Sequence, residues 1–285
     1  MQRQLSLLEQ QRLSHPNVSD DEHVVRWAAD VVHELGLEPP VDPELIASYL
    51  GVSDVESCDL DVAGCLWCGR DRVVIKVRRA DHPRRRRFTV CHECSHTFFP
   101  GFARQTQFRC NPGSERARDP KLERLCDVGA SELLLPRRQF SADIKEAGFS
   151  LDSVELFGGR YEASLEATAQ RAVALNGRPS LFIALEVMNK TRETDPFAPP
   201  KLRVARSRSN SGALPFVPRY KSVSEGTPLH RALTGDLVNE VGPLPELLGD
   251  ERPMEIHARR YDYGADGHIE RVVAVVQEPR RSTAR

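Results

Sequence analysis

Apolar residues in the first half of the chain recur every three to four positions in three stretches, which is the spacing of an amphipathic helix. The first stretch covers residues 22–35 and is followed by Gly36, a residue suited to a helix C-terminus. The second runs from Asp42, which is placed to cap it, to Leu50. The third covers residues 123–136, where small and apolar residues form one stripe. These patterns predict three packed helices.

Between the second and third helices the pattern changes to that of strands. Residues 63–67 and 72–77 flank the turn residues Gly69 to Asp71 and predict a hairpin within a small antiparallel sheet. Arginines dominate the stretch 78–87, which we expect to be a basic connector. The first half therefore reads as a mainly helical domain with a small sheet.

The second half begins with helical spacing and continues with strands. Helices are expected over 142–147 and 162–175, with a break at Gly158-Gly159 between them. After Gly177 the elements that we expect are the strands 180–188, 201–207, 254–263 and 269–277 and the helix 227–233. The fold class is therefore α+β, with a helical domain followed by a smaller α/β domain.

Composition narrows the class of protein. The chain has 285 residues, enough for two compact domains, and 40 basic against 41 acidic residues leave a net charge of −1. Because this charge is balanced, any nucleic-acid contact must come from a local cluster. The first 14 residues lack the apolar core of a signal peptide, and no apolar run is long enough to span a bilayer. We expect a soluble, cytoplasmic protein with no membrane partner.

Seven cysteines, an odd number in a chain without an export signal, are expected to be reduced thiols. Cys65 and Cys68 form one C-x-x-C. A structural zinc site there would need a second pair, so buried packing thiols are the favoured alternative. Cys91, Cys94 and Cys126 lie on predicted helices, where a packing role is also favoured.

The strongest chemical signal is His92-Glu93-Cys94-Ser95-His96, an H-E-x-x-H. On a helix, positions i and i+4 share one face, so both imidazoles can bind one zinc ion while Glu93 is placed to act as a base. A catalytic zinc takes three protein ligands, and Glu123 on the next helix is the candidate for the third. The alternative is ordinary surface polarity on a solvated helix. Manganese on the same three ligands remains a second possibility for the ion.

Two stretches carry a family resemblance. Arg86 to His96 resembles the R-F-T-x-A-H-E-x-G-H of ImmA/IrrE-type metallopeptidases, and Glu123 to Pro136 resembles their E-x-x-A-x-x-F-A-x-x-L-L-M-P. The chain departs from these patterns mainly at Ser95 for Gly, Cys126 for Ala and Gly129 for Phe. The resemblance implies that His92, His96 and Glu123 hold Zn²⁺ and that Glu93 is the catalytic base. It also implies a substrate class, helix-turn-helix repressors whose cleavage switches on a stress, mobile-element or defence operon.

The resemblance extends, more by architecture than by motif, to the rest of the chain. Residues 164–171 resemble the family's S-x-E-A-x-x-x-R run, for which a packing helix is favoured over a DNA reader. A GAF-like sensor domain is the C-terminal partner that the resemblance implies. The predicted organisation is a mobile N-terminal tail at 1–21, a zinc-peptidase domain at 22–136, a helical, helix-turn-helix-like segment at 137–176, the GAF-like domain at 177–278 and a basic tail at 279–285.

Two further hypotheses concern regulation. Cys110 lies on a Gly- and Pro-punctuated loop between the metal motifs, where its thiolate could occupy the water position on zinc and inhibit the enzyme, or could be a plain loop thiol. Basic residues of the C-terminal domain could bind single-stranded DNA, or could be a solvated face: Arg203, Arg206, Arg208, Arg219, Lys221, Arg259 and Arg260. The alternative function is a DNA- or ligand-sensing regulator in which zinc is structural and peptidase turnover is absent.

Overall fold

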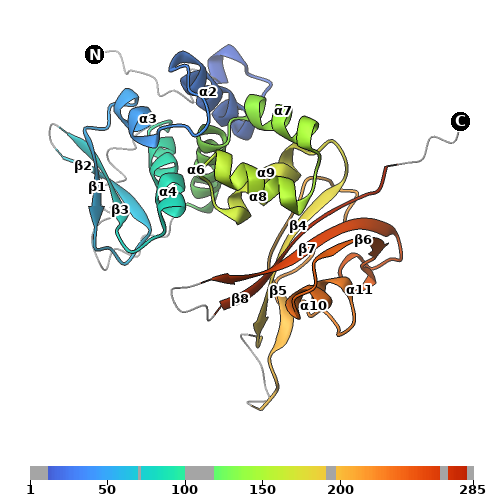
Figure 1. Cartoon of the computed structure of the whole chain (residues 1–285). Helices are drawn as coiled ribbons and strands as arrows, with labels where there is room; N and C mark the ends of the chain where they lie inside the picture. Colours follow the sequence, from blue (N-terminus) through green and yellow to red (C-terminus); the bar gives the residue numbers. More distant parts are fainter. Residues whose placement is uncertain (1–11, 70–71, 100–118, 191–196, 264–268, 281–285) are drawn as a thin grey trace, which may run out of the picture. The chain divides into compact units, whose positions relative to one another are not determined.

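The structure is a computed structural model, drawn in Figure 1, that describes residues 12–69, 72–99, 119–190, 197–263 and 269–280. The chain forms two compact units. The N-terminal unit comprises residues 1–140 and 157–164, and the C-terminal unit comprises residues 141–156 and 165–285. The helices of residues 137–176, predicted as a segment of their own, are thus divided between the two units. No helix in the described part of the chain combines the length and the apolar character needed to cross a bilayer.

The helices of the N-terminal unit have well-defined ends. They are α2 (Asp20–Glu34), α3 (Pro43–Tyr49), α4 (Pro83–His96) and α6 (Pro120–Leu134). The side chains of Ser19, Asp42 and Asp119 cap α2, α3 and α6 by accepting hydrogen bonds from first-turn amides. Gly36 takes a φ of +59° just after α2, where other residues would be strained. The three predicted helices are confirmed, and α4 is longer than the motif that it carries.

The length of α4 changes the interpretation of the basic connector. The helix begins at Pro83, whose fixed φ and missing amide hydrogen suit the first helical turn, and His82 caps it by accepting from the amide of Arg84. The last part of the predicted connector, through Arg87, is therefore helical. Its arginines lie in the first turns of the helix that ends with the H-E-x-x-H.

A three-stranded sheet packs against α4. Its strands are β1 (Asp54–Cys58), β2 (Gly64–Cys68) and β3 (Val73–Arg78), in the order β1-β3-β2. The predicted hairpin is confirmed as β2 and β3, which are antiparallel. The prediction of a purely antiparallel sheet is wrong for β1, which runs parallel to β3. The chain leaves β1 and enters the sheet again on the far side of β3, so β3 pairs with both neighbours and β2 becomes an edge strand.

The C-terminal unit contains a five-stranded antiparallel sheet. Its strands are β4 (Ser180–Met188), β5 (Lys201–Ser209), β6 (Val238–Pro243), β7 (Pro253–Tyr263) and β8 (Ile269–Gln277), in the order β5-β4-β8-β7-β6. The strand β6 was not predicted, because this edge strand ends in Gly242 and Pro243 and its buried and exposed positions alternate only weakly. The short helices α10 (Pro228–Leu233) and α11 (Pro245–Leu248) lie on one side of this sheet (Figure 1). They share a single apolar core with that face of the sheet.

The remaining helices are α7 (Arg137–Ala147), α8 (Leu151–Arg160) and α9 (Leu165–Leu175). The predicted break at Gly158-Gly159 is wrong, because α8 continues through both glycines to Arg160. Each glycine costs a helix about 1 kcal/mol relative to alanine. Val154 and Phe157, which are almost fully buried, offset this cost through the apolar area that they remove from water. Burial therefore overrides local helix propensity here.

One buried polar residue in α2 leads to a stability prediction. His23 is 1% exposed, and neither of its ring nitrogens has a hydrogen-bond partner among the described residues. A buried donor or acceptor without a partner costs about 1–3 kcal/mol, whereas an apolar side chain of similar volume at the same place carries no such cost. We expect His23→Leu to raise the free energy of unfolding by about 1 kcal/mol, measured by urea denaturation. A loss of stability would mean that the imidazole is hydrogen-bonded in solution.

Candidate metal centre

The site is built on α4, the helix that carries the H-E-x-x-H. His92 and His96 lie four residues apart on one face, and their ring centroids are 5.0 Å apart at an interplanar angle of 76°. His96 is 3% exposed and Glu93 is 5% exposed, so both side chains are withdrawn from bulk water. A buried carboxylate beside two imidazoles does not fit the alternative of a solvated helix face, because surface polarity would leave these groups exposed.

Glu123, in the first turn of α6, faces both histidines. Its Oε2 lies 3.3 Å from Nε2 of His92, and its Oε1 lies 4.0 Å from Nε2 of His96. Nitrogen and oxygen ligands at about 2.0–2.1 Å from a tetrahedral zinc ion lie about 3.3 Å apart. The pair formed by His92 and Glu123 matches this spacing, and the pair formed by His96 and Glu123 is wider. The three predicted ligands are thus brought together, with both Nε2 atoms directed at one carboxylate.

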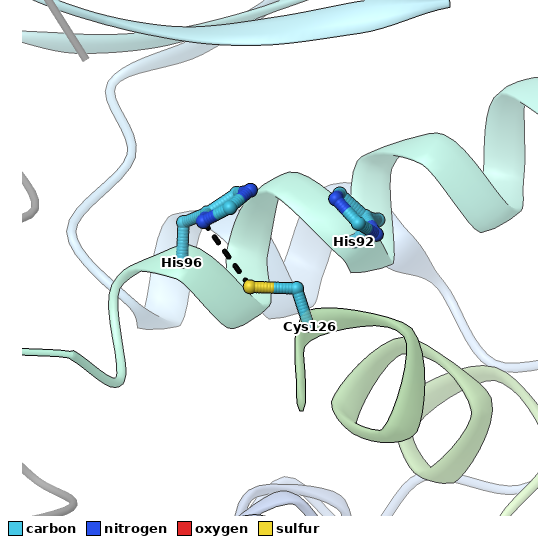
Figure 2. Close-up of side chains that lie close together, drawn as sticks. All are labelled: His92, His96 and Cys126. Carbon is cyan, nitrogen blue, oxygen red and sulfur yellow. Dashed lines mark hydrogen bonds between the residues drawn. The ribbon is translucent and has the colours of Figure 1, made fainter. Parts of the chain in front are cut away.

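Two side chains that follow Glu123 on α6 contact the other nitrogens of the imidazoles. Oδ1 of Asp127 lies 2.9 Å from Nδ1 of His92, and Sγ of Cys126 lies 3.1 Å from Nδ1 of His96. Figure 2 shows Cys126 reaching from α6 to the ring of His96 on α4. The sequence pattern does not single out Asp127, and for Cys126 it favours a plain packing role. The spacing Glu123-x-x-Cys126-Asp127, which places all three near one side of a helix, was the signal available.

Among the described residues, His92, His96 and Cys126 form a group whose candidate ligand atoms all lie within 4.8 Å of one another, whereas Glu123 approaches each histidine with a different carboxylate oxygen. A tetrahedral zinc ion would hold a nitrogen and a sulfur ligand about 3.5 Å apart. The contact between Cys126 and His96, at 3.1 Å, is shorter than this spacing and is a hydrogen-bond distance for sulfur. The short contact fits a hydrogen bond better than shared coordination, so His92, His96 and Glu123 stay the predicted ligand set.

The surroundings of His92 favour a positive charge. Burial, the largest single influence, lowers the pKa of this imidazole, but hydrogen bonds with Asp127 and Glu123 and the charge of Glu93 outweigh it and raise the pKa of His92 to about 9. Three carboxylates around one imidazole form a centre that attracts a cation. The chemistry of these side chains therefore fits a divalent metal ion.

The departures from the family pattern meet where α4 and α6 cross. A Cβ built on Gly129 would lie 2.5 Å from Oγ of Ser95 and 3.2 Å from Cε2 of Phe98. Ser95 stands where the family pattern has glycine, and Gly129 stands where it has phenylalanine. The absent side chain on α6 leaves room for the added hydroxymethyl group on α4. The two substitutions therefore compensate sterically and keep the helices in close contact.

The other cysteines of the predicted metal region have different surroundings. Burial raises the pKa of Cys91 to about 12 and the pKa of Cys94 well above its usual value, so both thiols stay protonated. Cys65 and Cys68 are buried on β2, and residues three apart on a strand point to opposite faces, which argues against a shared zinc ion. Cys110, the predicted inhibitory ligand, lies outside the described residues, and its role stays a prediction.

The predicted nucleic-acid residues have several partners within the C-terminal unit. Arg203 is buried and donates to the carbonyl oxygens of Met188 and Tyr220. Arg206 on β5 lies 3.5 Å from Glu166 of α9. A single-stranded nucleic acid would have to compete with these internal contacts of Arg203 and Arg206.

The remaining predicted residues lie on β5, on β7 and in the segment that follows β5. Arg259 pairs with Asp152 at 2.8 Å and Glu155 at 2.7 Å, and Arg260 pairs with Asp262 at 3.0 Å and Glu270 at 2.7 Å. The guanidinium of Arg219 lies over the ring of Tyr220, and Arg208 and Lys221 complete the set. Carboxylates lie beside Arg206, Arg259 and Arg260, and the nucleic-acid surface stays a prediction.

Two histidines of α4, a glutamate of α6 and a buried glutamate thus lie together, as predicted for a metallopeptidase site. Residues 59–173, which include β2, β3, α4 and α6, match the family model of the IrrE N-terminal-like domain, Peptidase M78. This match supports the resemblance to the ImmA/IrrE family and indicates a hydrolase of the metallopeptidase type.

The whole chain is also similar in fold to a solved structure, a Mycobacterium tuberculosis transcriptional regulator. The TM-score is 0.61 at 17% sequence identity, and the similarity covers 95% of this chain and 79% of that one. At 17% sequence identity, this similarity shows that the two folds are alike and nothing more. No curated protein matches the chain.

Proposed function

We propose that this protein is a zinc-dependent endopeptidase that cleaves a transcriptional repressor. The observation that carries the proposal is the direction of both Nε2 atoms, of His92 and His96, toward Glu123, with Glu93 buried beside them. The match of residues 59–173 to a peptidase domain supports the same class of reaction. His92, His96 and Glu123 would hold the ion, and Asp127 would keep the His92 ring oriented through Nδ1.

A zinc ion held by these residues would supply polarisation of the scissile carbonyl and a more acidic water molecule. The side chain of Glu93 then takes a proton from the attacking water and delivers it to the departing amine. Because Glu93 is buried, its carboxylate is shielded from bulk water and is held in place by the helix beside both ligands. The bound peptide must therefore pass close to Glu93, and β2 is the strand whose Gly64 lies beside that carboxylate.

The outer edge of β2 offers a surface on which a peptide can be held, because β3 is the one described strand that pairs with β2. The amide of Arg78 donates to the carbonyl of Ala63, and the amide of Gly69 donates to the carbonyl of Arg72. In an antiparallel pair, every second residue of a strand forms main-chain hydrogen bonds with its neighbour. In β2 the series that includes Ala63 and Gly69 bonds to β3, so the main-chain groups of the residues between them point away from β3. The main-chain groups of Gly64 and Leu66 are therefore directed to the outer edge, where an extended substrate can add as a strand.

Gly64 is the point where this edge meets the catalytic base. A Cβ built on Gly64 would lie 3.6 Å from Oε1 of Glu93 and 2.4 Å from Cγ2 of Thr89, both on α4. Any side chain at this position would push β2 away from the helix. The absence of a side chain at Gly64 thus sets the distance between the substrate strand and Glu93.

We expect Gly64→Ala to lower kcat/KM for peptide cleavage by about 10- to 100-fold, because a shift of about 1 Å between substrate and base has effects of this size. Zinc content, measured by mass spectrometry, should stay near that of the wild type. Gly159→Ala is the control, since a Cβ at that helical glycine meets no described atom within 4 Å. Equal cleavage by the Gly64 and Gly159 variants would show that β2 does not position the substrate.

The proposed substrate class comes from the family resemblance, and the likeness in fold to a transcriptional regulator is compatible with it. The repressor would be of the helix-turn-helix type, and its cleavage would derepress a stress, mobile-element or defence operon. The C-terminal unit, an antiparallel sheet with helices, would act as a GAF-like sensor. Single-stranded DNA is the proposed activator, acting through the basic residues of that unit.

The test is cleavage of helix-turn-helix repressors, first of any that a neighbouring gene encodes, by the purified, zinc-loaded protein, with and without single-stranded DNA. Product bands that depend on zinc and disappear with a chelator are the expected result. Near-stoichiometric zinc without cleavage under either condition would overturn the peptidase and favour a regulator with structural zinc. Cleavage that does not depend on DNA would contradict only the proposal that single-stranded DNA activates the enzyme.

A further inference from the structure

The two imidazoles of the metal centre are each held between the same kinds of partner. In His92, Nε2 faces Glu123 at 3.3 Å and Nδ1 contacts Asp127 at 2.9 Å. In His96, Nε2 faces Glu123 at 4.0 Å and Nδ1 contacts Cys126 at 3.1 Å. Cys126 therefore occupies, for His96, the place that Asp127 occupies for His92.

We propose that Cys126 is a positioning residue that fixes the His96 ring for metal binding. The inference rests on the metal centre of the proposed function. When Nε2 of a neutral imidazole is the ligand atom, Nδ1 carries the proton and needs an acceptor. Sγ of Cys126, fully buried at hydrogen-bond distance from Nδ1, is placed to accept it. The contact selects the tautomer and the ring orientation in which Nε2 is available to the ion.

The contact exists because α6 approaches α4 closely at this level. Gly129 lies three residues after Cys126, on the same side of α6, and Ser95 precedes His96 on α4. A Cβ at Gly129 would lie 2.5 Å from Oγ of Ser95 and 3.0 Å from its Cβ. With any side chain at Gly129 the two helices would have to separate, and the thiol would withdraw from Nδ1. Gly129 therefore permits the close approach of α6 to α4, and Cys126 forms the contact with His96 that this approach allows.

The experiment measures zinc affinity of the full chain by competition with a chromogenic chelator. We expect Cys126→Ala to weaken zinc binding by about 10- to 100-fold, the range found when partners of metal-bound histidines are removed. Cys126→Ser should restore affinity close to that of the wild type, because its hydroxyl can accept the same hydrogen bond. Cys126→Val, which fills the space without an acceptor, should behave like the alanine variant and serves if the smaller side chain impairs folding.

Cys91→Ala is the matched control. Cys91 is a fully buried cysteine on α4 that lies outside the group formed by His92, His96 and Cys126, so its loss removes packing alone. We expect a lower melting temperature and an unchanged zinc affinity. Gly129→Ala provides the complementary variant, because it keeps the thiol but separates the helices, and we expect weaker zinc binding from it as well.

Absorption spectra of the cobalt-substituted protein distinguish a positioning thiol from a ligand. With Cys126 outside the coordination shell, the wild type should show no sulfur-to-cobalt charge-transfer band. A band that disappears in Cys126→Ser would make Cys126 a direct ligand and overturn the proposal. Equal zinc affinity of wild type and Cys126→Ala would also overturn it while leaving the peptidase intact. Failure of the wild type to bind zinc at all would instead refute the proposed function.

Discussion

Glu93→Gln is expected to abolish peptide cleavage while leaving zinc in place. The amide of glutamine is nearly isosteric with the carboxylate but cannot accept a proton from water, and a general base contributes about 10²- to 10⁴-fold to the rate. Glu93 is buried in α4 between the two histidines without being one of the three ligands. Zinc content by mass spectrometry should therefore match the wild type, whereas repressor cleavage should fall by about 10³-fold.

A carboxylate elsewhere in the same helical pair controls for a general effect of the substitution. Glu132 on α6 is buried, and its Oε1 accepts a hydrogen bond from the amide of Arg137 at 2.7 Å. Glu132→Gln keeps an oxygen at this position, so we expect cleavage near the wild-type rate. Unchanged cleavage by Glu93→Gln would remove Glu93 from the role of base and would require another group to take the proton.

Glu123→Ala is expected to remove the metal itself. The substitution leaves two imidazoles, whereas a catalytic zinc site needs three protein ligands, and we expect an affinity loss of more than about 100-fold. Thermal unfolding gives a second measure, because a ligand at 100 times its Kd stabilises the native state by about 2.7 kcal/mol. Zinc should raise the melting temperature of the wild type and leave that of Glu123→Ala unchanged.

Asp127→Asn provides a graded comparison with Glu123→Ala. Asp127 reaches Nδ1 of His92 rather than the ion, so its substitution should lower zinc affinity by about 10- to 100-fold and retain a thermal shift at high zinc concentration. A larger loss of affinity in Glu123→Ala than in Asp127→Asn is the pattern expected from the geometry. If Glu123→Ala binds zinc as tightly as the wild type, His92, His96 and Cys126 become the ligand set.

The basic residues of the C-terminal unit show how tertiary contacts change the meaning of a charge pattern. In the sequence, Arg203, Arg206 and Arg259 are unassigned positive charges on strands. In the fold, the buried Arg203 bonds to two carbonyl oxygens, and Arg206 and Arg259 lie beside carboxylates of α9 and α8. Any activation by single-stranded DNA must work against these ion pairs, which makes the predicted effect strongly dependent on salt.

Local patterns in the sequence were enough to predict α2, α3, α6 and most strands, and to single out the three candidate ligands, but they assigned the first turns of α4 to a connector. The spacing of His92 and His96 is a local property, because four residues complete about one helical turn and place both rings on one face. The stripe of small residues in 123–136 likewise identified the partner helix and Glu123. The cap Asp42 acts within one turn, so the start of α3 follows from neighbouring residues, whereas α6 begins at Pro120, before the predicted residue 123.

Only the packing of distant segments decides which side chains contact the histidines. The same packing decides where β2, the proposed substrate strand, lies. Asp127 and Cys126 reach their imidazoles because α4 and α6 cross closely at Ser95 and Gly129, a distance between helices that no local pattern encodes. The strand β1 is parallel to β3, and the chain after β1 crosses to the other side of β3 before it forms β2. This crossing places Gly64 of β2 beside Glu93. These features join residues far apart in sequence, so packing of the whole unit sets them.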